Sequence, residues 1–126
     1  MELKIAIIGA GSSYTPELIE RLAQFGSRLP VRELAFVDIQ PERMEIVAGF
    51  CRRFLNHLGG ELRITTHTDR RRALEGAQFV ITQVRVGGNR QRVLDEKIPL
   101  QYGIIGQETT GPGGMFKALR TIPVML

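Results

Sequence analysis

Four short apolar runs alternate with longer amphipathic segments along the chain. The runs are rich in β-branched residues, as strands buried on both faces are, and they cover residues 3–8, 33–37, 62–66 and 79–84. Between them, apolar residues recur at steps of three and four, most clearly from Met44 to Leu58, which is the spacing of a helix with one buried face. The pattern predicts an α/β fold, a Rossmann-type doubly wound parallel sheet with strand order 3-2-1-4.

Local signals refine three of the predicted helices. Thr15, followed by Pro16, predicts an N-cap for the first helix. Asp69 predicts a cap for a short helix that runs through Glu75. Cys51 falls inside the apolar stripe of the second helix, so we expect a core residue and not a reactive thiol.

Length and composition indicate one domain over residues 1–126 and an ordinary soluble protein. No apolar run is long enough to cross a bilayer and no signal peptide precedes the first strand, so we expect a cytoplasmic protein without a membrane partner. A single cysteine suits a reducing compartment. The net charge of +4 comes largely from arginines on predicted helix faces, without interleaved aromatic residues, which favours a solvated surface over nucleic-acid binding. Positive charge also suits a phosphorylated small substrate.

A glycine-rich segment follows the first predicted strand. Gly9 allows a tight turn, Gly11 allows a pyrophosphate to approach the backbone, and Ser12 and Ser13 add hydroxyl groups beside a helix N-terminus that favours anions. Tyr14 replaces the usual third glycine of the dinucleotide fingerprint, so we expect the helix to start late, near residue 15. A purely structural turn is the alternative interpretation.

Asp38 ends the second predicted strand, where an acid can bind a ribose 2′-hydroxyl. A carboxylate there repels a 2′-phosphate, so the sequence favours NAD over NADP. The alternative role for Asp38 is a cap for the helix that starts near Pro41.

Two polar segments lie in the last third of the chain. Residues 85–92 contain three arginines around two glycines and predict a mobile, cationic loop suited to a carboxylate or phosphate, although each arginine could equally be solvated. Residues 106–114 are glycine-dense and polar between two helical patterns, which predicts a shaped loop that places side chains.

These segments together resemble glycoside hydrolase family 4, nearest its 6-phospho-β-glucosidases. The resemblance rests on residues 11–18, 85–88, 95–100 and 106–114 and covers the whole chain in order. It implies hydrolysis of 6-phospho-β-glucosides that depends on NAD and a divalent cation, usually manganese, and is an exception to the paired-carboxylate mechanism. In the mechanism that the resemblance implies, NAD⁺ transiently oxidises the sugar at carbon 3, a base removes the proton at carbon 2, the aglycone is eliminated, water adds, and the hydride then returns to the sugar.

The resemblance also implies residue roles. Gly9, Gly11, Ser12, Ser13 and Asp38 match NAD-binding positions. Arg92 matches a contact to the phosphorylated sugar. Glu108 matches an acid that raises the basicity of a catalytic tyrosine, with a loop-capping carboxylate as the alternative.

The family's tyrosine base and its cysteine and histidine metal ligands lie beyond these motifs. None matches a residue here, neither Cys51, His57 nor His67, and neither Tyr14 nor Tyr102 matches the base. We therefore expect a chain truncated before the C-terminal substrate and metal portion, inactive alone, from an enzyme that forms a homo-oligomer. Two alternatives remain: an NAD-dependent 2-hydroxyacid dehydrogenase of the lactate and malate type, and a non-catalytic NAD-binding module.

Overall fold

The computed structural model describes residues 2–126 and contains two compact units. The first ends at Val84 and the second comprises Arg85–Leu126. Each unit has its own internal packing and is described by itself. That residues 1–126 act as a single NAD-binding domain stays a prediction.

The first unit is built on a four-stranded parallel sheet. Its strands are β1 (Leu3–Ile8), β2 (Val31–Val37), β3 (Arg63–His67) and β4 (Phe79–Thr82), in the order β3-β2-β1-β4. This is the predicted order and the predicted α/β class. β4 ends two residues earlier than expected, and His67 is the last residue of β3 instead of following it.

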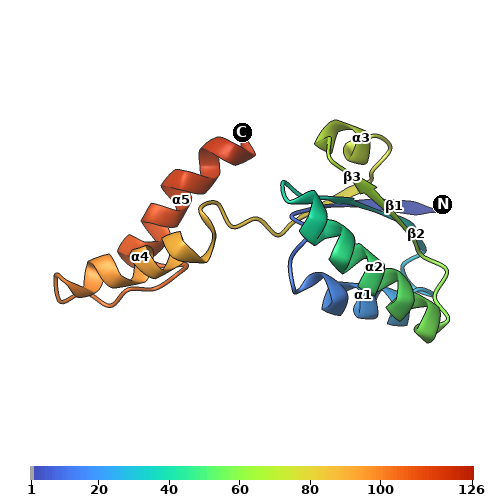
Figure 1. The fold of residues 1–126 in the computed structure, drawn as a ribbon, viewed down its shortest axis with the longest axis horizontal. Coiled ribbons are helices and arrows are strands. Elements are labelled where there is room, and N and C mark those ends of the chain that lie inside the picture. The colour runs from blue at the N-terminus through green and yellow to red at the C-terminus, as the bar shows by residue number, and fades with distance from the viewer. Residues whose placement is uncertain (1) are drawn as a thin grey trace. The chain divides into compact units, whose positions relative to one another are not determined.

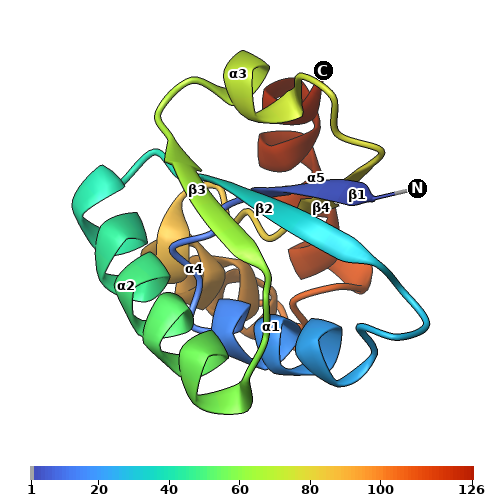
Figure 2. The same ribbon diagram turned by 90° about the vertical axis from the view of Figure 1, so that its right-hand side faces the viewer.

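Helices cover both faces of this sheet. α1 (Thr15–Gln24) and α2 (Pro41–Leu58) lie side by side on one face, and the short α3 (Arg70–Leu74) lies on the other (Figures 1 and 2). The main core lies beneath α1 and α2 and includes Ile7, Phe36 and Cys51, all fully buried. The predicted core position of Cys51 is therefore confirmed, and burial raises the pKa of its thiol to about 11.

The starts of α2 and α3 agree with the sequence, whereas the cap of α1 does not. Asp69 caps α3 as predicted, since its side chain accepts a hydrogen bond from the Arg71 N–H at 2.9 Å. The prediction that Thr15 caps α1 is wrong. Thr15 is already helical, and its hydroxyl donates backwards to the Ala10 carbonyl at 2.9 Å, so it holds the glycine turn and not the helix end.

The second unit consists of α4 (Gly88–Leu100) and α5 (Gly111–Met125), which pack on each other. The prediction of a mobile loop over residues 85–92 is wrong, because α4 begins at Gly88 and takes in two of the three arginines. Gly87, at φ +83°, turns the chain into the helix, where glycine was expected to loosen it. The second predicted loop ends at Thr110, since Gly111 and Pro112 begin α5.

None of the helices within residues 2–126 is long and apolar enough to cross a membrane.

Candidate functional site

The glycine turn connects β1 to α1 at the carboxyl end of the sheet, where ligands of open α/β sheets bind. Gly9 has φ +89°, and a Cβ there would lie 2.6 Å from the Gln83 carbonyl oxygen beyond β4. The N–H groups of Gly9 and Ala10 both donate to the Val37 carbonyl, at 2.8 and 3.0 Å. The turn is thus wedged between the ends of β2 and β4, and only glycine fits its first position.

Asp38 lies directly over the second glycine of the turn. Its Oδ2 accepts the Gly11 N–H at 2.8 Å, and a Cβ on Gly11 would lie 2.8 Å from the same oxygen. Glycine is therefore required at position 11 for a second purpose besides the approach of a pyrophosphate, because any side chain there would collide with the Asp38 carboxylate. The structure brings together two residues that are 27 positions apart in the sequence.

The second oxygen of Asp38 bears on the alternative role as a helix cap. Oδ1 accepts the Gln40 N–H at 2.9 Å, which fixes the turn that leads into α2, but the N-cap of α2 is Gln40 itself. Each oxygen of the half-buried carboxylate accepts one N–H in these contacts and keeps a further lone pair that a hydroxyl could use. Asp38 can fix the turn and bind a ribose at the same time.

The two serines of the turn differ in role. The Ser12 Oγ accepts the Tyr14 N–H at 3.2 Å, so it stabilises the turn locally. Ser13 is exposed, and its N–H donates to no other residue among 2–126. As predicted from the missing third glycine, the helix starts only at Thr15.

Sequence reasoning missed two residues of this site. Thr15 is fully buried and accepts a hydrogen bond from Gln83 Nε2 at 3.2 Å, which ties the turn to the end of β4. Arg43, on the first turn of α2, donates from Nε to the Gly11 carbonyl at 2.7 Å. No local pattern marks Arg43, because its partner is 32 positions earlier in the chain.

Glu108 and Arg92, predicted from separate segments, meet in the second unit. The Glu108 carboxylate lies 2.5 Å from Arg85 Nη1, 3.3 Å from Arg92 Nε and 3.3 Å from Lys117 Nζ. Arg92 Nε also lies 2.9 Å from Glu96. Lys117 was not predicted, because it is on α5, beyond the loop that carries Glu108.

This cation cluster keeps Glu108 ionised. The hydrogen bond from Arg85 is the main cause of the lowered pKa of Glu108, with Lys117 and the charge of Arg92 adding to it and partial burial opposing it. The carboxylate is bound by side chains of α4, α5 and the segment before α4, so it does more than cap its own loop. It is a negative charge held among three cations.

A buried ion pair holds the two helices of this unit together. Arg120 of α5 donates from Nη1 and Nη2 to the two oxygens of Asp95 of α4, at 2.8 and 2.6 Å. The Asp95 side chain is 6% exposed, and the hydrogen bonds from Arg120 lower its pKa. Arg120 also bonds the carbonyls of Val86 and Phe116.

The loop that carries Glu108 passes very close to these helices. A Cβ at Gly106 would overlap the Glu96 carbonyl, and a Cβ at Gly113 would overlap the Gln107 carbonyl. Neither glycine has a positive φ, so close approach, not backbone conformation, requires glycine there. The predicted shaped loop is thus fixed by contact with its own unit.

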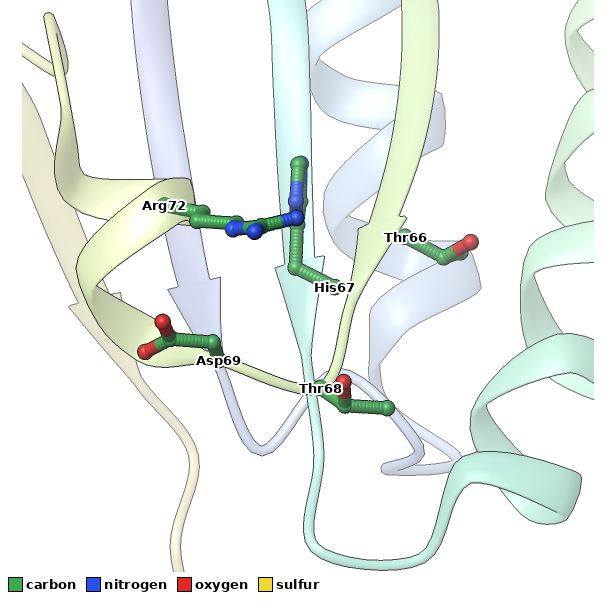
Figure 3. Close-up of a pocket in the computed structure, with 5 residues that line it drawn as sticks. All are labelled: Thr66, His67, Thr68, Asp69 and Arg72. Atoms are coloured by element: carbon green, nitrogen blue, oxygen red, sulfur yellow. The ribbon is translucent and has the colours of Figure 1, made fainter.

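A pocket of about 410 Å³ lies at the carboxyl end of β3 (Figure 3). Thr66 and His67 line it from the strand, Thr68 and Asp69 from the following turn, and Arg72 from α3. It contains none of the predicted site residues, and Asp69 is already engaged as the cap of α3. Within the described part of the chain, no group of three or more histidine, cysteine or acidic side chains could hold a metal ion.

The parallel sheet with a glycine turn after β1 and an acid after β2 defines a Rossmann-like nucleotide-binding class. Residues 4–126 match the family described as "Family 4 glycosyl hydrolase", and the chain belongs to that family. Membership favours a glycosidase over the dehydrogenase alternative.

Curated relatives carry phosphoglucosidase names. The chain is 54% identical to a "Probable 6-phospho-beta-glucosidase" of Bacillus subtilis and 48% identical to a "6-phospho-beta-glucosidase" of Escherichia coli, in both cases with 98% of this chain aligned. It is also 42% identical to "6-phospho-alpha-glucosidase 1" of Lacticaseibacillus paracasei, with 97% aligned. In each case the chain spans only 28% of the relative's length.

Solved structures of the family are similar over nearly the whole chain. A 6-phospho-beta-glucosidase from Thermotoga maritima, solved with NAD and glucose-6-phosphate, has a TM-score of 0.91 at 41% identity, over 99% of this chain and 30% of that one. A 6-phospho-alpha-glucosidase from gut microorganisms, solved with NAD and Mn²⁺, has a TM-score of 0.91 at 34% identity, over 99% of this chain and 28% of that one.

Proposed function

We propose that this chain is the NAD-binding part of an NAD- and divalent-metal-dependent enzyme that hydrolyses 6-phospho-β-glucosides. The observation that carries the proposal is the glycine turn closed by Asp38, whose carboxylate follows β2 at the position that binds a ribose hydroxyl in nucleotide-binding sheets. Two of the solved relatives contain NAD, which supports the same assignment.

The residues of the turn fit a dinucleotide. Ser13 offers an unused N–H and an exposed hydroxyl beside the start of α1, where an anion is favoured. Asp38 keeps lone pairs for a ribose hydroxyl and its charge disfavours a 2′-phosphate, so NAD is preferred to NADP. Gly9, Gly11 and Ser12 hold the backbone of the turn in place.

The second unit supplies charge to the substrate side of the proposed enzyme. Arg92 and Arg85 are cations suited to the sugar phosphate. Glu108, held ionised by its three cations, would disfavour loss of a proton from a neighbouring base that this chain does not contain and so raise that base's pKa. NAD, when bound, supplies the hydride acceptor for a sugar hydroxyl. The divalent ion, manganese in the solved relative, would be held by ligands outside this chain.

The β assignment rests on identity. Two relatives named 6-phospho-beta-glucosidase are 54% and 48% identical, against 42% for one named 6-phospho-alpha-glucosidase, although a further 6-phospho-beta-glucosidase is also 42% identical. We further propose that the complete enzyme is cytoplasmic and homo-oligomeric.

Calorimetric titration of the chain with NAD tests the cofactor assignment. We expect micromolar-range affinity. Asp38→Ala should weaken it at least tenfold, about 1.4 kcal/mol, because the same carboxylate both stabilises the turn and accepts the ribose hydroxyl. Glu42→Ala, which removes an exposed acid from the first turn of α2, is the charge-matched control. If the unmodified chain binds no NAD, the cofactor assignment is wrong.

The anomer preference is tested in the whole enzyme with paired α- and β-linked 6-phosphoglucosides. Turnover of the α substrate alone would contradict the β assignment.

A further inference from the structure

Both peptide groups that flank Gly11 are fully bonded within the protein. In the peptide before Gly11, the carbonyl of Ala10 accepts the Thr15 hydroxyl at 2.9 Å and the Gly11 N–H donates to Asp38 at 2.8 Å. In the peptide after it, the Gly11 carbonyl accepts Arg43 Nε at 2.7 Å and the Ser12 N–H donates to the Gly9 carbonyl at 3.1 Å. The turn is therefore held in one shape by the protein's own groups.

Arg43 is the exposed member of this set of contacts. Gly11 and Thr15 are buried and Asp38 is half-buried, whereas Arg43 lies on the outer surface of α2 and reaches back over the turn. Its Cγ would lie 3.4 Å from a Cβ at position 11, an ordinary van der Waals contact, so the stem of Arg43 packs close to the turn at Gly11. A solvent-exposed arginine normally samples many rotamers, whereas the hydrogen bond to the Gly11 carbonyl restricts Arg43 to one arrangement.

We propose that Arg43 is a positioning residue for the dinucleotide, a role that rests on the proposed NAD function. By holding the Gly11 carbonyl, it fixes the plane of the Gly11–Ser12 peptide, from which the chain continues through Ser12 to the N–H of Ser13. The Ser13 N–H is the first in the turn that donates to no other described residue, so it is the first available to a phosphate. A turn that is already fixed binds its ligand without a further ordering cost.

Two substitutions separate the hydrogen bond of Arg43 from its charge. In Arg43→Gln, the amide nitrogen stands at the same number of bonds from the backbone as Nε, so the donor to Gly11 is kept and the positive charge is lost. Arg43→Met keeps a flexible stem of similar reach but removes both. Arg53→Met is the matched control. Arg53 lies exposed on the same helix and has no hydrogen-bond or ion-pair partner among residues 2–126, so this change removes one charge and no contact of that kind.

The measurements are NAD affinity by calorimetry and the exchange rate of the Ser12 amide by NMR without ligand. We expect Arg43→Met to weaken NAD binding about tenfold and to speed Ser12 exchange, with Arg43→Gln within about threefold of the unmodified chain and Arg53→Met unchanged. Equal affinity in the chain and Arg43→Met would overturn the proposal. An NAD affinity of Arg43→Gln as low as that of Arg43→Met would also overturn it, because the charge of Arg43 and not its hydrogen bond would then determine the affinity. If the unmodified chain binds no NAD, the proposed function fails and the cofactor role of Arg43 with it, while Ser12 exchange still shows whether Arg43 holds the turn.

Discussion

Replacing Arg120 by methionine should loosen the second unit, because it removes the only cation that hydrogen-bonds Asp95 among the described residues. The carboxylate is 6% exposed and would stay buried without the two bonds it now accepts at 2.8 and 2.6 Å. Breaking a buried ion pair from one side costs about 3–5 kcal/mol. The Arg120 side chain is 27% exposed, so water can partly replace it and the lower limit, about 3 kcal/mol, applies.

Amide hydrogen exchange resolved along α4 and α5 measures this loss in the unit concerned. A cost of about 3 kcal/mol corresponds to exchange roughly 100-fold faster in both helices, with no change in β1 or β2. Arg90→Met, an exposed residue of α4 without a hydrogen-bond or ion-pair partner in residues 2–126, should leave exchange unchanged. The double variant Asp95→Asn/Arg120→Met should be less destabilised than Arg120→Met alone, because no charge is then left buried.

The pH dependence gives the same pair a second test. The pKa of Asp95 is lowered in the fold, so its contribution to stability is present above the ordinary value near 4 and is lost as pH falls through the folded value. In Arg120→Met, the hydrogen bonds and charge of Arg120 are lost while the charge of Lys117 still opposes the effect of burial, so the pKa of Asp95 rises and protonation should then stabilise the variant. The difference in stability between the unmodified chain and Arg120→Met should therefore shrink below about pH 4. A loss under 1 kcal/mol at pH 7, or a pH-independent difference, would refute the reasoning.

Two further predictions concern the first unit. Gly9→Ala should lower its unfolding free energy by about 2 kcal/mol or more, since φ is +89° and the new Cβ would lie 2.6 Å from the Gln83 carbonyl oxygen. In thermal melts Gly49→Ala on α2 should instead be neutral or stabilising, because its Cβ meets only the Arg53 side chain at 3.6 Å; equal effects would contradict the role of Gly9. Cys51, with its pKa raised to about 11, should react with a thiol reagent at pH 8 only after denaturant is added, and rapid reaction in the native state would contradict its burial.

Periodicity was enough to predict the sheet and its order. The apolar runs of β1 to β4 are local, and right-handed crossovers leave few ways to arrange four parallel strands. The capping of α3 by Asp69 could also be predicted from the sequence, because the cap and its partner Arg71 are only two residues apart. The family motifs also follow from residue order alone, and the family match extends over residues 4–126.

Prediction failed where the fold, and not a local sequence rule, decides a residue's partner. Thr15 satisfies every local rule for an N-cap, yet its hydroxyl bonds back to Ala10 because the turn folds over it. Glycines near residue 87 indicated a loop, whereas contact with α5 stabilises a helix from Gly88.

By itself the sequence determined the α/β class, the strand order, the turn after β1 and the family, because each depends on neighbouring residues or on their order. The tertiary structure alone decided which side chains share a site. It brought Arg43 to Gly11 across 32 positions, and Lys117 and Arg85 to Glu108 across 9 and 23. Hydrogen bonds and ion pairs act over about 3–4 Å, and only folding brings such residues within that distance.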